Sequence, residues 1–349
     1  KVELVTRMIA PFPDSAATDS RPLREVVGEF FAPGGALADV TTGDFEFEAR
    51  PQQQQMAGAV AAALADERHL IVEAGTGVGK SLAYLVPLLL HARQQGIRVL
   101  VSTHTIALQE QLLGKDLPML HERLGFEFRA VLVKGRMNYL CLRRLARARS
   151  HQRELFSDGV AEELERIRSW ADKTDDGSLQ EWRHEPSAEA WGAVCAEHGN
   201  CLGAKCPERK RCFLLRARAK MQDAHLLVAN HHLLFSDLAL RQDGAAFLPD
   251  VGAVVLDEAH MVEDTASEHL GLRLSTYGFE HWLRRLFVPE SGKGLLGYLR
   301  AGAAARVATE LWPAVADLFH EVPRLVGLGP HDGQKVVAQP LQLVTNVSE

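Results

Sequence analysis

The stretch Ala74-Gly-Thr-Gly-Val-Gly-Lys80-Ser81 decides the fold expected for this chain. It follows the apolar run His69-Leu-Ile-Val72, and a helix is predicted to open at Ser81, so the stretch is a turn between a strand and a helix. Glycines let backbone N–H groups close around phosphate oxygens, and the helix N-terminus points its positive dipole end at the same anion. The pattern predicts a P-loop for a nucleoside triphosphate, built from Ala74, Gly75, Thr76, Gly77, Val78, Gly79, Lys80 and Ser81.

Two of these residues carry distinct chemistry. Lys80 is expected to reach the β and γ phosphates, and Ser81 is expected to hold Mg²⁺. The strict pattern begins with glycine, whereas this chain has Ala74. A glycine-rich turn before an ordinary helix is the alternative, but the strand before the turn and the helix after it favour a P-loop that binds ATP.

A second acidic motif follows the apolar run Ala253-Val-Val-Leu256, which is predicted to be a buried parallel strand. Directly after it come Asp257 and Glu258, in the order Asp-Glu-Ala-His. In P-loop enzymes an acid at such a strand end ligates Mg²⁺, and the next Glu orients and deprotonates the attacking water. We therefore predict Asp257 as the metal carboxylate and Glu258 as the general base. An Asp-Glu pair taken alone would more often lie on the solvated surface or cap the helix that follows.

The overall composition excludes several classes of protein. With 349 residues, 46% hydrophobic and 24% charged, the chain is long enough for two or three domains and is not a small disulfide-stapled fold. The formal charge of −6 gives no sign of nucleic-acid binding, so that function has to be inferred from local clusters of basic residues. No apolar stretch is long enough to span a bilayer and no signal peptide is evident, which predicts a cytoplasmic protein with no membrane partner. The absence of an initiator methionine before Lys1 is compatible with a fragment of a longer protein.

Hydrophobic periodicity predicts an α/β fold with a doubly wound parallel sheet. Residues 1–43 form a lead-in of uncertain structure, residues 44–133 and 223–270 form the α/β domain, residues 134–222 are a helix-prone insertion, and residues 271–349 are mostly helical. The expected strands are 69–72, 98–101, 130–133, 224–229 and 253–256, and the expected helices are 53–64, 81–93 and 106–113.

All the cysteines of the chain fall in the insertion: Cys141, Cys195, Cys201, Cys206 and Cys212. Free cysteines usually behave as small core residues and would be expected in the buried strands. Cys201, Cys206 and Cys212 are spaced C-x4-C-x5-C, and with Cys141 they can offer four thiolates to one inorganic centre. The centre could be a [4Fe–4S] cluster or tetrahedral zinc, and the absence of C-x2-C knuckles favours the cluster. Cys195 is the surplus residue, although it could replace Cys201, and a cluster of reduced thiols is the remaining alternative.

Several motifs together resemble the DinG and XPD group of iron–sulfur superfamily 2 DNA helicases. They are the P-loop, the stretch from Ser102 to Leu112, Lys134-Gly-Arg-Met-Asn-Tyr-Leu-Cys141, the three spaced cysteines, Ala229-Asn-His-His-Leu-Leu234 and Asp257-Glu-Ala-His260. The resemblance covers about residues 45–265. It implies a P-loop RecA-like first helicase domain interrupted by a [4Fe–4S] cluster domain with Cys141, Cys201, Cys206 and Cys212 as ligands, and a partial helical arch domain from residue 271.

The resemblance also implies a function: ATP-driven 5′ to 3′ movement along single-stranded DNA and unwinding of forked duplex DNA. Arg50 and Gln53 lie in a stretch similar to the family's nucleotide-base motif. The family's second RecA-like domain, which carries the arginine finger, has no counterpart before Glu349, so we expect this chain to bind ATP and hydrolyse it poorly without a downstream second domain.

Candidate DNA contacts lie around the last two cysteines. Basic residues with Tyr139, Phe213 and Arg136 beside them offer phosphate neutralisation and stacking, although a solvated helix face is the common alternative. The basic residues are Lys205, Arg209, Lys210, Arg211, Arg216, Arg218 and Lys220.

Residues at the predicted strand ends have separate roles. Ser102, Thr103 and His104 end one strand and are candidate contacts to the DNA backbone. His231 and His232 are expected in packing or a polar network, because no third metal ligand lies at a convincing spacing.

Two other functions stay open at the level of sequence. One is a redox-responsive nucleic-acid-binding module in which nucleotide is only a regulatory ligand. The other is a P-loop ATPase with a zinc-stapled insertion and no translocation.

Overall fold

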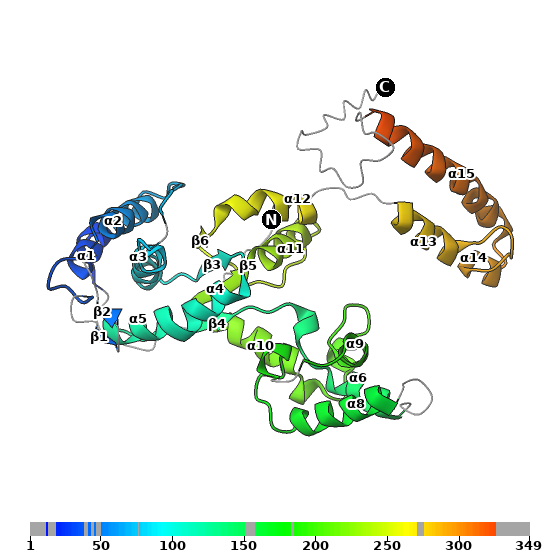
Figure 1. Ribbon diagram of the computed structural model, residues 1–349, viewed down its shortest axis with the longest axis horizontal. Coiled ribbons are helices and arrows are strands. Elements are labelled where there is room, and N and C mark those ends of the chain that lie inside the picture. Colours follow the sequence, from blue (N-terminus) through cyan, green and yellow to red (C-terminus); the bar gives the residue numbers. More distant parts are fainter. Residues whose placement is uncertain are drawn as a thin grey trace, which may run out of the picture. The chain divides into compact units, whose positions relative to one another are not determined.

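The computed structural model describes residues 12, 19–37, 41–42, 45–46, 50–75, 77–150, 158–182, 185–270 and 276–325. The chain divides into two compact units, residues 1–271 and residues 272–349. The first unit contains the sheet and the insertion, and the second contains the C-terminal helices (Figure 1). The four domain boundaries inferred from sequence stay predictions.

A four-stranded parallel sheet forms the centre of the first unit (Figure 1). Its order is β4 (Ala130–Leu132), β5 (Leu226–Asn230), β3 (Val99–Thr103) and β6 (Ala253–Leu256). In register, Val101 of β3 lies opposite Val228 of β5 and Val255 of β6. All three pairings are parallel, so each strand returns to the sheet through a crossover connection. The predicted α/β fold class is confirmed.

Both faces of this sheet carry apolar packing, as a doubly wound fold requires. On one face, Val99 and Val101 pack with the buried side chains of α2 (Pro51–Ala65) and α3 (Lys80–Gln95). On the other face, Leu100 and Leu227 pack with Leu234 of α11 (His231–Gln242). Successive strand residues point to opposite faces, which explains why neighbours in β3 belong to different clusters.

The helix following β3 is interrupted by an unusual turn. It runs as α4 (Ile106–Gln111), continues through a π-helical turn over Leu112–Asp116, and resumes as α5 (Leu117–Arg123). Pro118 lies in the first turn of α5, where the missing N–H costs little. The sequence predicted only the first part of this helix.

One predicted strand is absent, and another is less buried than predicted. Residues 68–75 adopt neither helix nor strand, and the Ile71 side chain is 97% exposed. Within the described ranges β6 pairs only with β3, so β6 is an edge strand, and Val254 and Leu256 are 45% and 39% exposed. A strand is defined by its hydrogen-bonded neighbour, and no described strand neighbours residues 69–72 or the outer edge of β6. The strand predicted over 69–72 and the full burial predicted for β6 are therefore wrong.

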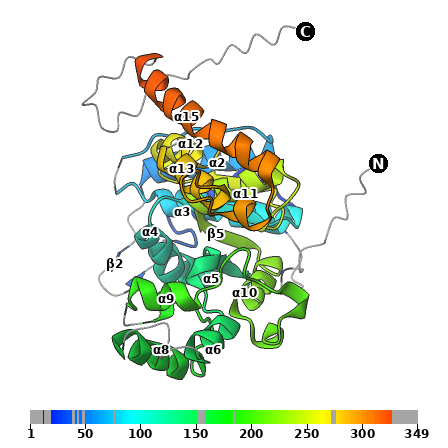
Figure 2. The same ribbon diagram turned by 90° about the vertical axis from the view of Figure 1, so that its right-hand side faces the viewer.

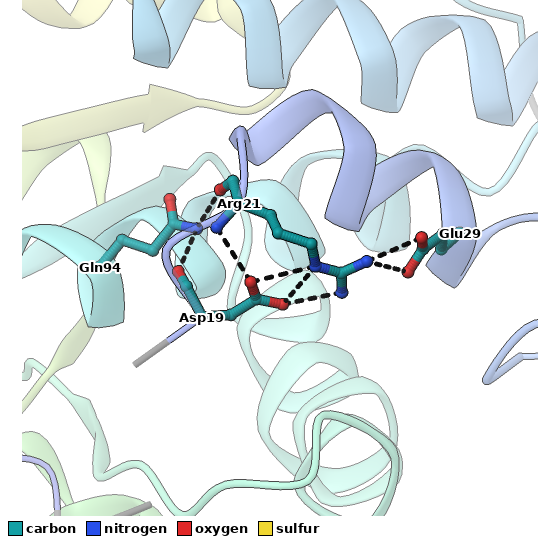
Figure 3. A network of polar contacts seen from close by, with 4 residues as sticks. All are labelled: Asp19, Arg21, Glu29 and Gln94. Atoms are coloured by element: carbon teal, nitrogen blue, oxygen red, sulfur yellow. Dashed lines mark hydrogen bonds and ion pairs between the residues drawn. The ribbon is translucent and has the colours of Figure 1, made fainter. Parts of the chain in front are cut away.

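The lead-in contains a helix that the sequence did not predict. Helix α1 (Leu23–Phe30) buries Leu23, Val27 and Phe30 in the apolar cluster that α2 and α3 share. Arg21 pairs with Asp19 at 2.8 Å and with Glu29 at 2.7 Å, while Gln94 of α3 donates to the carbonyls of Asp19 and Arg21 (Figure 3). These contacts fix the start of α1 against the end of α3. A short antiparallel pair, β1 (Thr41–Thr42) and β2 (Phe45–Glu46), follows.

The insertion is helical and has its own apolar cluster, which includes Leu145, Leu164, Ile167 and Trp191. Its helices α6, α8 and α9 lie together in Figure 2, and α10 leads back to β5. The bounds are α6 (Leu142–Ser150), α8 (Asp158–Ala171), α9 (Ala188–Val194) and α10 (Phe213–Gln222), with 3₁₀ turns at Arg136–Asn138, Leu179–Glu181, Gly203–Lys205 and Arg209–Arg211.

The first unit ends with a 3₁₀ turn (Ala259–Met261) and α12 (Val262–Leu270). The second unit consists of α13 (Thr276–Leu286), α14 (Leu295–Tyr298) and α15 (Gly302–Leu325). Phe279 and Phe319 make an edge-on ring contact between α13 and α15. None of the helices in the described part of the chain combines the length and apolar character needed to cross a bilayer.

Candidate nucleotide site and nucleic-acid surface

The glycine-rich turn before α3 contains two glycines in the left-handed backbone region. Gly77 and Gly79 have φ angles of +80° and +83°, which residues with a Cβ rarely adopt. Arg50 donates to the Gly77 carbonyl, and Gln53 Nε2 donates to the Gly79 carbonyl at 3.0 Å. A Cβ on Gly79 would lie 2.1 Å from Gln53 Nε2, so this close approach requires glycine. The start of α2 therefore holds the loop, and Thr76 lies outside the described residues.

The structure brings Lys80 to the paired acids. Lys80 Nζ lies 3.6 Å from Glu258 Oε1, with both side chains about one-third exposed. On the next turn of α3, Tyr84 Oη donates to Asp257 Oδ2 at 3.0 Å. Burial, and then the negative charge of Asp257, raise the pKa of Tyr84, so its phenol stays protonated and donates. Helix α3 and the end of β6 thus form one polar site.

The backbone at Glu258 is strained. Its φ of 54° and ψ of 47° lie in the left-handed region, which for a residue other than glycine costs about 1–3 kcal/mol. The Glu258 N–H donates to Asp257 Oδ1 at 3.0 Å, which supports the turn. Such strain is concentrated at functional sites, and here it directs the Glu258 side chain back toward Lys80.

A buried histidine network supports the end of β6. Ser102 Oγ donates to His231 Nδ1 at 2.7 Å, and His231 Nε2 donates to the Asp257 carbonyl at 2.9 Å. The Asp257 N–H donates to the Ser102 carbonyl at 2.8 Å. Burial lowers the pKa of His231, which favours the neutral ring that Nδ1 needs to accept from Ser102. The expectation of a polar network at His231 is confirmed.

The same packing overturns part of the predicted DNA surface. Ser102 and Thr103 are fully buried, so their side chains cannot contact a phosphate backbone. Thr103 Oγ1 donates to the Thr105 carbonyl at 3.3 Å. His104 is half-buried, and its Nδ1 has no hydrogen-bond partner within the described ranges.

Asp116 is a site residue that sequence reasoning missed. It lies in the π-helical turn, is only 8% exposed, and its Oδ2 has no hydrogen-bond partner among the described residues. Burial raises the pKa of Asp116, and the nearby polar groups of Gln111, Lys115 and Ser81 oppose that rise. Asp116 therefore lies near the serine that follows Lys80. The sequence carried little signal, because Asp116 follows Lys115 in Leu-Leu-Gly-Lys-Asp-Leu, a pattern typical of an exposed helix face. The burial of the carboxylate, which is costly, comes from packing, and π-helical turns are frequent at functional sites.

The cysteines fall into two environments. Cys195 is buried, and its Sγ lies 3.9 Å from the Gly192 carbonyl and from Arg144 Nη1; burial raises the pKa of this thiol. Cys141, Cys206 and Cys212 are half-buried and Cys201 is exposed.

Three of the four candidate cysteine ligands, all except Cys206, have neighbours in common. Cys141 and Cys212 border the insertion's apolar cluster, and Arg218 faces both Cys201 and Cys212. Among the described residues no three cysteine sulfurs lie within 4.8 Å of one another, whereas tetrahedral zinc with bonds of about 2.3 Å needs sulfurs about 3.8 Å apart.

The basic residues of the insertion are mostly exposed, but their aromatic neighbours are not. Tyr139 and Phe213 are buried in the insertion's apolar cluster, so the prediction that they stack on bases is wrong. Arg216 lies over the Phe213 ring at 4.7 Å, and Arg211 pairs with Asp172 at 3.4 Å. The surface that remains is a set of cations: Lys205, Arg209, Lys210, Arg211, Arg216 and Lys220 are exposed, and Arg136 and Arg218 are half-buried.

Comparisons with known proteins identify helicases as relatives of this chain. Residues 50–150 match the family described as DEAD/DEAH box helicase. The protein named ATP-dependent DNA helicase YoaA of Escherichia coli (strain K12) is 38% identical over 253 residues, which are 70% of this chain and 38% of that protein. The ATP-dependent helicase DinG of Mycobacterium tuberculosis (strain ATCC 25618 / H37Rv) is 38% identical over 244 residues, 65% of this chain and 36% of that protein.

A third relative carries a different name. The 3'-5' exonuclease DinG of Bacillus subtilis (strain 168) is 31% identical over 243 residues, 69% of this chain and 25% of that protein. The chain thus spans 38% or less of the length of these relatives. Together with the parallel sheet, these matches show that the chain is similar to the DEAD/DEAH box helicases named DinG and YoaA.

Proposed function

We propose that this chain is the ATP-binding part of an ATP-dependent DNA helicase that moves 5′ to 3′ along single-stranded DNA and unwinds forked duplexes. The observation that carries the proposal is the approach of Lys80 Nζ to Glu258 Oε1, at 3.6 Å, beside Asp257. Two segments far apart in sequence supply the phosphate-binding cation and the acids that ATP hydrolysis requires. The helicase names of the relatives support DNA as the substrate.

The residues at the site suit MgATP. Ser81 and Asp257 offer the hydroxyl and carboxylate oxygens that Mg²⁺ prefers, and they would hold an ion that adds positive charge at the phosphates when bound. Arg50 and Gln53 hold the loop through Gly77 and Gly79, and they are proposed to contact the nucleotide base.

Lys80 and Glu258 work as a pair. Lys80 reaches the phosphates, and phosphate binding competes with Glu258 for the ammonium group. Glu258 is then available to orient the attacking water and accept its proton. Glu258, with its left-handed backbone, has its carboxylate 3.6 Å from Lys80 Nζ.

Full turnover requires a second cation at the γ-phosphate. In related P-loop enzymes an arginine finger raises the rate by about 10³–10⁵. We propose that a downstream second RecA-like domain supplies this arginine and closes the ATP site, so that the present chain binds ATP but hydrolyses it slowly.

The insertion is proposed to hold the cluster and to contact the DNA strand. Cys141, Cys201, Cys206 and Cys212 supply four thiolates, which would hold a [4Fe–4S] group that adds a rigid inorganic crosslink when bound. Cys195 is unsuited to ligation because its thiol is buried against Arg144. The exposed cations around Cys206 and Cys212 neutralise backbone phosphates without reading sequence.

An unwinding assay tests this function in a longer form of the protein that includes the second RecA-like domain. Wild type is expected to unwind a fork with a 5′ single-stranded tail and not one with only a 3′ tail. Glu258→Gln should bind ATP but lose about 10²–10⁴ of the unwinding rate, because it cannot accept the water's proton. Glu263→Gln, an exposed change on α12, is the matched control. Unwinding from 3′ tails alone, or an unchanged rate in Glu258→Gln, would refute the proposal.

A further inference from the structure

We propose that His232, Glu268 and His269 form a binding site for a divalent transition-metal ion of the zinc type. His232 lies in the first turn of α11, while Glu268 and His269 lie in the last turn of α12. The sequence offered His232 no third ligand at a convincing spacing, but the packing of α11 against α12 brings two more donors to it.

The distances fit a metal ion. His232 Nδ1 lies 3.1 Å from His269 Nε2 and 3.6 Å from Glu268 Oε2, and the three donor atoms all lie within 4.8 Å of one another. Bonds of about 2.0–2.2 Å at tetrahedral angles place zinc ligands about 3.3 Å apart. Small side-chain rotations would therefore suffice to enclose an ion. Across the described ranges, no other set of three or more His, Cys, Asp or Glu side chains brings its donor atoms so close together.

A supporting hydrogen bond orients one of the ligands. Ser236, one turn after His232 on α11, lies with its Oγ 3.2 Å from His269 Nδ1. When Nδ1–H donates to this hydroxyl, the Nε2 lone pair of His269 faces His232 Nδ1, which then donates its own proton to Nε2. Ligand histidines in metal sites usually have such a partner on the other ring nitrogen. Metal binding at His232 Nδ1 would require the neutral ring to carry its proton on Nε2 instead, a change of tautomer with no net release of a proton.

The donor set selects the class of ion. Two imidazoles and one carboxylate suit Zn²⁺, Co²⁺ or Ni²⁺, whereas Mg²⁺ and Ca²⁺ prefer oxygen ligands. The site is therefore chemically distinct from the Mg²⁺ position at Ser81 and Asp257. The His232 and Glu268 side chains are about half exposed, so an ion can enter and water can complete its coordination.

The position of the site suggests what the ion would do. Helix α11 begins at His231, which holds the Asp257 carbonyl, and α12 follows directly on the turn after Glu258. An ion shared by the two helices would clamp together the elements that lead away from the nucleotide site. Because the ion binds the folded state, it would also stabilise that state in proportion to RT ln(1 + [metal]/Kd).

Cobalt titration of the full chain tests the site, with visible absorption and total bound metal as readouts. Wild type is expected to bind one more Co²⁺ than His269→Ala, with ligand-field bands that lack the charge-transfer absorption of thiolate ligands. His320→Ala removes an exposed imidazole from α15 and should bind cobalt like wild type. Ser236→Ala should weaken binding about 10–100-fold through loss of the supporting hydrogen bond. His232→Ala, at an exposed position, repeats the test if His269→Ala fails to fold. Equal cobalt uptake by wild type and the folded histidine variant would overturn the proposal.

Discussion

The His231 imidazole links three parts of the nucleotide site. It accepts from Ser102 on β3, donates to the carbonyl of Asp257 at the end of β6, and begins α11 itself. The contact with Ser102 requires the neutral ring, since a protonated Nδ1 cannot accept a hydrogen bond. Protonation would therefore remove that acceptor and place a positive charge in this buried network, while Nε2–H still donates to the Asp257 carbonyl.

This arrangement predicts a pH-dependent contribution to stability. Burial lowers the pKa of folded His231 below its ordinary value of 6.5, so below pH 6.5 the unfolded chain binds a proton that the folded chain does not. The free energy of unfolding should fall as pH drops through this region. His231→Leu should cost about 1–3 kcal/mol near neutral pH, because Ser102 and Asp257 lose their partner, and should show a shallower fall with acid. Urea unfolding of both proteins above and below pH 6.5 measures this; identical pH slopes would contradict the assignment.

The chemical residues of the site could be predicted from sequence, but their buried neighbours could not. Lys80, Asp257 and Glu258 belong to motifs whose spacing carries the chemistry, and the structure brings them together. Ser102 and Phe213 were predicted to contact DNA because they lie beside such motifs in the sequence, yet both are buried. Burial depends on which distant elements pack above a residue, and no local pattern encodes that.

At the scale of elements, the predicted strands that pair in the sheet are confirmed, whereas the strand predicted over residues 69–72, which pair with no described strand, is wrong. The bounds predicted for β3, β4, β5 and β6 lie within one or two residues of the observed bounds. Apolar, β-branched runs bounded by turns are typical of parallel strands, which is why these could be predicted. Residues 69–72 have the same composition, yet they are not in a strand. Composition records a preference for extended structure, whereas strand formation also needs a neighbour to receive its hydrogen bonds.

The elements of the insertion predict which cysteines bind iron. Cys212 caps the start of α10 and Cys141 precedes α6, whereas Cys195 ends α9 with its thiol buried against Arg144. Anaerobically purified wild type should be coloured and contain about four iron atoms per chain. Cys195→Ser should keep the iron and the broad visible absorption, and Cys212→Ser should lose both. Zinc in place of iron, or loss of the metal in Cys195→Ser alone, would argue against the assigned ligands.

At the scale of the whole molecule, the chain combines a RecA-like unit with a separate helical unit. The P-loop, the acids and the insertion all belong to residues 1–271, so nucleotide chemistry and the cysteines share one compact unit. An ion pair joins the sheet to the insertion: Lys134, just after β4, pairs with Asp176 of the insertion at 2.7 Å. The α/β class followed from the sequence, whereas this contact depends on packing between distant segments.

Equilibrium binding of MgATP to this chain tests the central claim that the glycine-rich loop and the paired acids form one nucleotide site. Wild type should bind one MgATP, and Lys80→Ala should bind it about tenfold or more weakly, since the lost contact is a hydrogen bond between charged groups. Lys293→Ala, which removes an exposed lysine from the second unit, should bind like wild type. Equal MgATP affinity in Lys80→Ala and wild type would contradict the account.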